Sequence, residues 1–214
     1  MSAPATPELR RGLLVLGAVA AGAAALVALT WQAAAPRIDA NVAARAEAAI
    51  AAVLGSVAFD NRLSATAQAP DSPAARQAGV EQTWVARQGT TPVALVLQIS
   101  TADGYSGRIV LLVGLTPAGE VLGVETLAHR ETPGLGDFIE TTRSDWLGQF
   151  RGRRLGAPPA EAWRVQRDGG AFDAVTGATV TARAVTGALR RALVYFDTEG
   201  EALLQPADPQ AAQP

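Results

Sequence analysis

The first part of the chain contains long apolar stretches. Residues 12–36 carry no charged side chain, and residues 39–55 are rich in Ala with apolar positions at helical spacing. Both stretches predict helix, and Gly55 is a typical residue to end the second one. Residues 64–79 are small and polar and contain Pro, which predicts a loop before the spacing changes.

Four shorter apolar runs follow, and they predict β-strands. They are rich in Val, Ile and Leu, and the segments Gly-Thr-Thr, Ala-Asp-Gly-Tyr-Ser and Pro-Ala-Gly between them have the composition of turns. Strands joined by such short connections pair as antiparallel neighbours. The predicted strands are residues 82–88, 92–101, 107–116 and 120–129.

The last third of the chain mixes helix and strand patterns. We predict a helix over residues 138–150, a short strand over 162–167 and a helix over 179–200 that ends at Gly200. Residues 201–214 are predicted to be disordered. The predicted fold class is α+β: an antiparallel sheet with helices packed on one side, tethered by an N-terminal helix.

The uncharged stretch is long enough to cross a bilayer, since a transmembrane helix needs about 20 apolar residues. We therefore predict one transmembrane helix over residues 12–35, with Trp31 as an interfacial anchor. One alternative is a cleaved signal peptide, whose apolar region has only about 7–15 residues. A buried helix of a soluble protein is the other. Two Arg residues precede the stretch and two follow it, so the Arg distribution leaves the orientation open.

Charge and composition exclude several kinds of chemistry. The formal net charge of −2 gives no indication of nucleic-acid binding, and all eighteen basic residues are Arg. The chain has no Cys, which excludes thiolate catalysis, disulfides and iron–sulfur ligation. Its single His excludes an all-His metal site. We therefore assign no catalytic residue and no metal ligand.

The string Ala-Val-Thr-Gly-Ala occurs twice, at residues 174–178 and 184–188. The first copy lies in a turn before the predicted helix, where unpaired backbone N–H groups favour a phosphate. The second copy lies inside that helix, where the N–H groups are already paired. The sequence therefore favours the first copy as a site for a phosphate-bearing partner.

The residues around the first copy fit such a site. Gly177 allows close approach of the backbone, Ala178 is small, and three hydroxyl groups lie near the same turn, those of Thr176, Thr179 and Thr181. The alternative is an ordinary helix N-cap provided by Thr176 or Thr179.

The segment Asp-Ala-Val-Thr-Gly-Ala-Thr, residues 173–179, is similar to the flavinylation motif of FMN-binding domains, Asp-x-x-(Ser/Thr)-Gly-Ala-Thr. The resemblance implies that a flavin transferase takes FMN from FAD and esterifies its phosphate to Thr179. It also implies that Asp173 is the acidic residue that the transferase needs. The second copy has Arg183 and Leu189 at the corresponding positions, so it lacks both the acid and the acceptor.

A second segment, Ala-His-Arg-Glu-Thr-Pro-Gly-Leu-Gly-Asp-Phe-Ile-Glu, residues 128–140, resembles the His-x-Glu-Thr-Pro-Gly-Leu-Gly segment of the same family. Residues 105–127 look like the family's preceding hairpin, and residues 144–150 follow as expected. The resemblance implies that this loop packs beside the flavin ring. The residues expected there are Thr132, Gly134, Leu135 and Gly136, with His129 and Glu131 as candidate proton relays. Without the resemblance the segment is a Pro-Gly loop after a strand.

Together the two segments resemble the G subunits of the Rnf electron transport complex. The resemblance implies an electron-carrying subunit with covalently bound FMN, in a complex that couples electron transfer between ferredoxin and NAD to ion translocation. The implied partners are the other membrane and peripheral subunits of that complex, and a flavin transferase for maturation. The implied location is the bacterial inner membrane, with a single span and the domain on the periplasmic side.

Two alternatives remain. The C subunit of the sodium-translocating NADH:quinone reductase shares the flavinylation motif, and a non-redox, membrane-anchored binding or assembly domain is an alternative of another class. The predicted organisation is a cytoplasmic N-terminus (1–11), a transmembrane helix (12–35), a linker helix and loop (36–79), a periplasmic FMN-binding domain (80–200) and a disordered tail (201–214).

Overall fold

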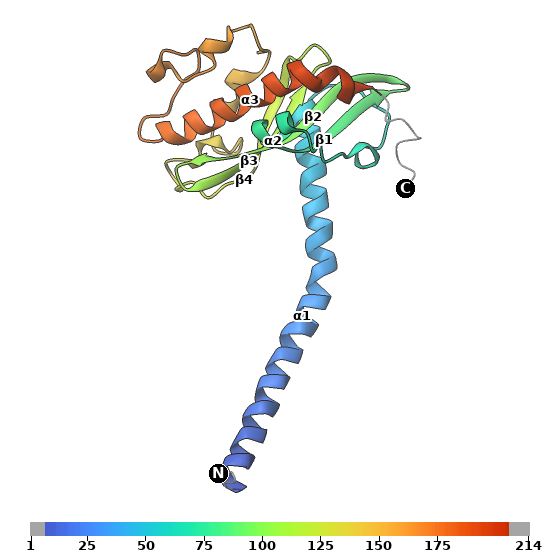
Figure 1. Cartoon of the computed structure of the whole chain (residues 1–214), viewed down its shortest axis with the longest axis vertical. Helices are drawn as coiled ribbons and strands as arrows, with labels where there is room; N and C mark the ends of the chain where they lie inside the picture. The colour runs from blue at the N-terminus through green and yellow to red at the C-terminus, as the bar shows by residue number, and fades with distance from the viewer. Residues whose placement is uncertain (1–6, 206–214) are drawn as a thin grey trace. The chain divides into compact units, whose positions relative to one another are not determined.

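The computed structural model describes residues 7–205, except for the side chains of residues 7–10, 12, 15, 33, 36–46 and 65. The chain divides into two compact units, Met1–Glu47 and Ala48–Pro214. The first unit is helical, and the second contains the sheet and the remaining helices (Figure 1).

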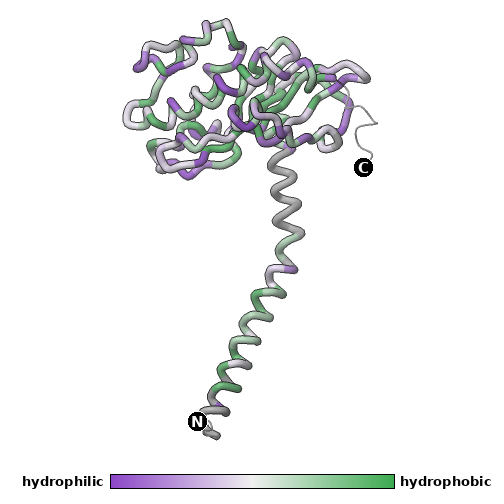
Figure 2. Tube along the Cα trace, viewed as in Figure 1, coloured by the Kyte–Doolittle hydropathy of each residue, from purple (hydrophilic) through white to green (hydrophobic). Residues whose placement is uncertain are grey.

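Helix α1 (Pro7–Leu54) is continuous, whereas the sequence predicted two separate helices over 12–35 and 39–55. Its early part is apolar (Figure 2), and its large apolar side chains are exposed: Leu13, Leu14, Leu16, Val19, Leu26, Val27, Leu29 and Trp31. Within the portion of the chain that the structure describes, no helix meets the combined length and apolarity that crossing a membrane requires. The predicted span includes positions 12, 15 and 33, whose side chains lie outside that portion.

The end of α1 follows the sequence prediction. Gly55 adopts a left-handed conformation with φ of 58°, and its N–H donates to the carbonyl of Ala51 at 3.0 Å. A glycine takes this conformation without the steric cost that a Cβ atom imposes. The helix therefore ends at Leu54, one residue before the predicted stop.

The second unit is built on a four-stranded antiparallel sheet in the order β1-β2-β3-β4. This topology confirms the predicted meander, in which every strand pairs with its neighbour in the chain. The strands are β1 (Val80–Gln88), β2 (Thr91–Gly104), β3 (Gly107–Leu115) and β4 (Val121–Ala128).

One face of the sheet is covered by helix α3 (Thr179–Leu204), which crosses the strands, and by the short helix α2 (Pro73–Ala78) (Figure 1). Alternate strand residues such as Leu95, Leu97 and Leu111 point into this core together with Val185 and Leu189 of α3. The main core is thus formed by alternate residues of the strands and by the residues on one face of α3.

The other face packs against the last turns of α1, so helices lie on both sides of the sheet and the prediction of one side was wrong. Ile50 and Val53 pack there with Trp84 and Leu112. The paired residues Gly114 and Gly123 make this possible, because a Cβ on Gly114 would lie 2.5 Å from the carbonyl oxygen of Val53. Residues 48–54 therefore belong to the second unit, whereas the sequence predicted that the folded domain begins at residue 80.

The predicted helix over residues 138–150 does not form. Only two short 3₁₀ turns occur, η2 (Asp137–Ile139) and η3 (Trp146–Phe150). The hydroxyl of Ser144 donates to the carbonyl of Phe138 at 2.6 Å, and such local side-chain bonds compete with helical backbone bonds.

The predicted strand over residues 162–167 is also wrong. The chain forms the 3₁₀ turns η4 (Ala160–Ala162) and η5 (Gln166–Asp168), with a single parallel bridge between Val165 and Phe172. The side chains of Trp163 and Phe172 pack together with Phe150, with a Trp163–Phe172 ring-centroid distance of 4.7 Å. Aromatic packing and local backbone hydrogen bonds to residues 170–172 hold this segment outside the sheet.

The predicted loop over residues 64–79 contains the 3₁₀ turn η1 (Leu63–Thr66) and helix α2. Helix α2 has typical capping residues at both ends. Ser72 is the N-cap and accepts a hydrogen bond from the N–H of Ala75 at 3.0 Å, and Gly79 is the C-cap with φ of 72°.

Helix α3 does not end at Gly200 but continues to Leu204, so the first residues of the predicted tail are helical. A Cβ on Gly200 would lie 2.8 Å from the ring of Phe196, so this glycine makes room for an aromatic side chain. Residues 206–214 of the predicted tail lie outside the described residues.

Candidate functional site: a cavity between two glycine turns

The segment Thr132–Leu135 forms a tight turn after strand β4. The N–H of Leu135 donates to the carbonyl of Thr132 at 3.1 Å, and Gly134 has φ of 78°. Proline at the second position and a positive φ at the third define a type II turn, which explains the Thr-Pro-Gly-Leu sequence. The turn places Leu135 at the surface, where 53% of the residue is exposed.

A second glycine turn precedes helix α3. The N–H of Ala178 donates to the carbonyl of Val175 at 3.0 Å, and Gly177 has φ of 88°. Ala178 is the N-cap residue and supplies no side-chain acceptor, so the alternative of an N-cap by Thr176 or Thr179 is wrong. The first N–H groups of α3, from Thr179 onward, are therefore left without a side-chain cap.

The two turns meet at one cavity of about 340 Å³. The methyl Cδ2 of Leu135 lies 3.8 Å from where a Cβ on Gly177 would be, so the loop and the motif lie side by side although about forty residues of sequence separate them. Seven of the residues singled out in the sequence line the cavity: Glu131, Thr132, Leu135, Gly136, Gly177, Ala178 and Thr181. The other five, His129, Gly134, Asp173, Thr176 and Thr179, lie outside its lining.

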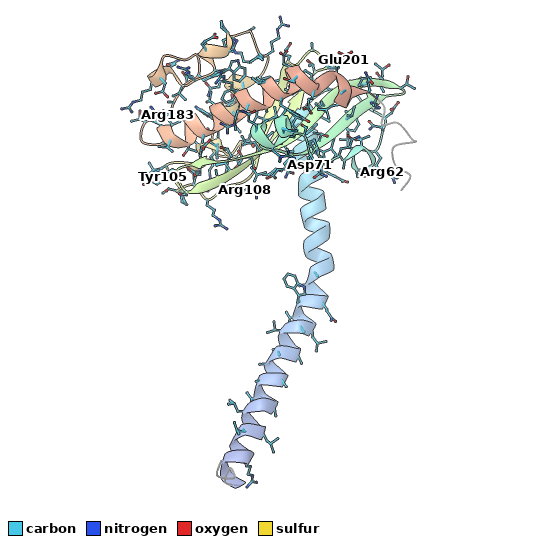
Figure 3. All side chains as sticks on the ribbon, in the orientation of Figure 1. Arg62, Asp71, Tyr105, Arg108, Arg183 and Glu201 are labelled. Carbon is cyan, nitrogen blue, oxygen red and sulfur yellow. The ribbon has the colours of Figure 1, made fainter. Side chains whose placement is uncertain are left out.

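Two cavity residues were not expected from the sequence. Tyr105, 73% exposed, lies at the tip of the β2–β3 hairpin (Figure 3), and Val180, 43% exposed, lies in the first turn of α3. Together with Leu135 they give the cavity an apolar, solvent-facing rim. The position of Tyr105 at the hairpin tip follows from the pairing register, in which Gly104 and Gly107 face each other across the turn. The sequence alone does not give this register.

Glu131 is a buried residue of the cavity lining, and its hydrogen bonds connect three segments. Its carboxylate accepts hydrogen bonds from the N–H groups of Tyr105 at 3.3 Å and Ser106 at 2.9 Å, and from the hydroxyl of Thr181. A Cβ on Gly136 would lie 2.7 Å from the Cβ of Glu131, so Gly136 must lack a side chain. The geometry makes Glu131 a structural anchor of the site.

His129 is also held by structural hydrogen bonds. Its Nδ1 accepts from the N–H of Glu131 at 3.1 Å, which places the proton of the neutral ring on Nε2. Nε2 lies 2.9 Å from Oε1 of Glu140. Both ring nitrogens therefore have partners within the protein, and the imidazole orients the start of the loop.

Asp173 is exposed, and its backbone is fixed from both sides. Its N–H donates to Oε1 of Gln149 at 2.7 Å, and its carbonyl accepts from the indole N–H of Trp146 at 3.0 Å. Trp146 and Gln149 thus position the motif, and sequence reasoning missed this role. Their side chains come from the 3₁₀ turn η3, which the sequence interpreted as part of a helix.

The second Ala-Val-Thr-Gly-Ala copy lies in the middle of α3, as predicted. Thr186 is 1% exposed, and its hydroxyl donates to the carbonyl of Ala182 at 2.8 Å. Arg183, at the position of the acid in the first copy, pairs with Asp168 at 2.6 Å. This copy therefore offers neither a free hydroxyl nor a free helix end.

Comparison with known proteins identifies the family to which this part of the chain is similar. Residues 104–194 match the family described as the FMN-binding domain, a range that contains both glycine turns. The G subunit of an ion-translocating oxidoreductase complex from Pseudomonas aeruginosa strain UCBPP-PA14 is 42% identical over 97% of this chain and 98% of its own length. The corresponding G subunit from Escherichia coli O157:H7 is 38% identical over 92% of this chain and 95% of its own length.

Among solved structures, a crystal structure of NqrC from Shewanella oneidensis is similar with a TM-score of 0.47 and 24% identity. The similarity covers 65% of this chain and 69% of that chain.

The fold and the matched residues, 104–194, show that the second unit contains an FMN-binding domain of the α+β class. With relatives of this identity over nearly its whole length, the chain belongs to the family of G subunits of ion-translocating oxidoreductase complexes.

Proposed function

We propose that the chain is the electron-carrying subunit of a membrane complex and holds FMN through a phosphoester to Thr179. The complex would couple electron transfer between ferredoxin and NAD to ion translocation, as membership of the G-subunit family suggests. The observation that carries the proposal is the meeting of two motifs, the turn before Thr179 and the Thr132–Leu135 turn, at one cavity.

The site offers backbone donors for the phosphate of FMN and an apolar surface for its ring. The uncapped start of α3 presents N–H groups and the positive end of the helix dipole, which suit a phosphate next to Thr179. The exposed side chains of Tyr105, Leu135 and Val180 offer an apolar surface for a flat ring, and the two glycines bring backbone close to it. Bound FMN supplies the electron-transfer chemistry, and the protein supplies attachment, orientation and tuning.

Attachment requires a flavin transferase and FAD. The hydroxyl oxygen of Thr179 forms a bond to the phosphorus of the FMN half, the phosphoanhydride bond breaks, and AMP leaves. The hydroxyl proton passes to solvent. Asp173 supports this step: its carboxylate is exposed, while Trp146 and Gln149 hold its backbone in place.

We propose that residues 12–35 anchor the chain in the bacterial inner membrane and that the second unit faces the periplasm. The exposed apolar side chains of this part of α1 support anchoring, because water would solvate them poorly. A membrane anchor keeps the carrier beside its partner subunits at high effective concentration.

The proposal is tested by producing the chain together with a flavin transferase and comparing variants on a denaturing gel under ultraviolet light. Thr179→Ala is expected to fold and to lose its fluorescence, whereas Thr179→Ser retains a hydroxyl acceptor and keeps some. Thr186→Ala is the matched control from the second copy and is expected to stay fluorescent. Fluorescent Thr179→Ala with dark Thr186→Ala would reverse the assignment.

A further inference from the structure

A second cavity of about 340 Å³ lies along α3 and shares no residue with the flavin cavity. We call it the arginine cleft, because four Arg residues line it, Arg164, Arg183, Arg190 and Arg191, together with one acidic residue, Asp168. The second Ala-Val-Thr-Gly-Ala copy contributes to its floor through Thr186 and Gly187, and Gly187 places no side chain there. The proposed flavin site makes no use of this cleft.

The cleft has an excess of positive charge. Arg183 pairs with Asp168 at 2.6 Å, and Arg191 lies 3.3 Å from Asp103. Within the described part of the chain, Arg164 and Arg190 form no ion pair. Four guanidinium groups thus face two carboxylates, which leaves two positive charges without a partner.

The cleft also has more hydrogen-bond donors than acceptors. The unpaired guanidinium groups carry five N–H donors each and no acceptor. Trp163 lines the cleft as well, and its buried indole N–H has no acceptor among the residues that the structure describes. The hydroxyl of Thr186 already donates to the carbonyl of Ala182 at 2.8 Å, so its proton is not available to a ligand.

We propose that the arginine cleft binds a phosphate dianion, as in a phosphate monoester. Guanidinium groups recognise phosphate through paired hydrogen bonds in a fixed geometry. The two unpartnered charges match the charge of about −1.5 to −2 that a phosphate monoester carries at neutral pH, whereas one carboxylate would neutralise only half of them. Trp163 and Val165 also border the cleft, but they are 1% and 0% exposed, so the guanidinium groups present the binding surface.

The test uses the full-length, flavinylated chain in detergent, with inorganic phosphate as the probe in isothermal titration calorimetry. The double variant Arg164→Gln with Arg190→Gln removes the two free guanidinium groups and should weaken phosphate binding by at least about tenfold, the change that a single charge-assisted contact contributes. The matched control is Arg153→Gln with Arg154→Gln, which removes two exposed charges outside the cleft and should bind like the wild type. Circular dichroism shows whether all three proteins are equally folded.

The source of the phosphate is resolved by a second arm with nanodiscs that contain phosphatidic acid or only phosphatidylcholine. Stronger retention on phosphatidic acid that the cleft variant loses assigns a lipid headgroup, and phosphate binding without it assigns a free monoester. Equal phosphate affinity in the wild type and the cleft variant would overturn the proposal. So would succinate binding as tightly as phosphate, because the cleft would then select carboxylates.

Discussion

Glu131 shows how one buried side chain can organise a binding surface. Its carboxylate joins the hairpin tip at Tyr105 and Ser106 to the first turn of α3 at Thr181, and His129 fixes the backbone on which it stands. A buried acceptor shared by three donors stabilises each of the segments that would contact the flavin. In this chain Glu131 therefore has a structural role in addition to the proton relay predicted for it.

Replacing Glu131 with Ala should destabilise the domain by about 1–3 kcal/mol, because the buried hydroxyl of Thr181 and the partly buried N–H groups of Tyr105 and Ser106 would lose their acceptor. Glu131→Gln keeps two acceptor lone pairs and should cost less. Urea unfolding followed by circular dichroism measures both changes. A Glu131→Ala variant as stable as the wild type would show that water replaces the carboxylate and that the anchor is dispensable.

Tyr195 provides a prediction about pH. Burial in the α3 core, with the nearby Glu199 carboxylate, raises the pKa of Tyr195 from 10.0 to about 12. Between these two values the unfolded chain loses the phenolic proton while the folded chain keeps it, so the free energy of unfolding falls as pH rises through this window. Below pH 10 the two states hold the proton equally.

Tyr195→Phe should remove this part of the alkaline loss of stability. The hydroxyl of Tyr195 is buried and has no hydrogen-bond partner in the described residues, so its removal should leave stability at pH 7 unchanged or raised. Thermal unfolding at pH 7 and at steps from 10 to 12 measures both effects, with Tyr105→Phe as the exposed control. An identical alkaline decline in Tyr195→Phe would assign that decline to other groups.

Elements with a clear periodicity of apolar residues were predictable from the sequence, and elements held by side-chain packing were not. Apolar spacing indicated the four strands and α3, and characteristic residues indicated the two flavin motifs. The region from Phe138 to Phe172 was not predictable in this way, because an aromatic cluster and the Ser144 hydroxyl hold it in 3₁₀ turns. Helix α2 was missed although Ser72, Pro73 and Gly79 are typical capping residues.

The contact between the two glycine turns could be expected only through resemblance. Nothing in the spacing brings Leu135 to Gly177, since forty residues of irregular chain separate them. The roles of Tyr105, Trp146 and Gln149 depend on the fold itself. Sequence reasoning thus named residues on both turns and missed the side chains of Tyr105, Trp146 and Gln149.

We expect the Thr132–Leu135 turn to influence the environment of the flavin. Leu135→Ala should leave the covalent attachment intact, because the acceptor lies in the other turn, and should shift the flavin absorbance or its reduction potential. Leu135 is exposed, so the fold should tolerate the change. Val194→Ala, an exposed residue of α3 outside the flavin cavity, is the control. If both variants match the wild-type spectrum and potential, the ring lies elsewhere.

For the whole molecule, the division into two units suits a redox domain attached to a membrane anchor. We expect the full chain to stay in the membrane fraction after alkaline carbonate washing, and protease added to spheroplasts to digest the second unit. Replacing Leu14 and Leu26 with Arg should release the chain, because each charge in an apolar span costs about 2.5–3.5 kcal/mol. If carbonate washing released the wild-type protein, residues 12–35 would not be a membrane anchor. If the second unit resisted the protease, it would lie on the cytoplasmic side.

The central claim, that FMN is esterified to Thr179, can be tested in the wild-type protein by tandem mass spectrometry of a tryptic digest. Cleavage after Arg places the first copy in the peptide of residues 168–183 and the second in the peptide of residues 184–190. We predict that the flavin phosphate is found on the first peptide, with fragment ions that assign it to Thr179. Flavin on Thr176, Thr181 or the second peptide, or no covalent flavin at all, would contradict the account.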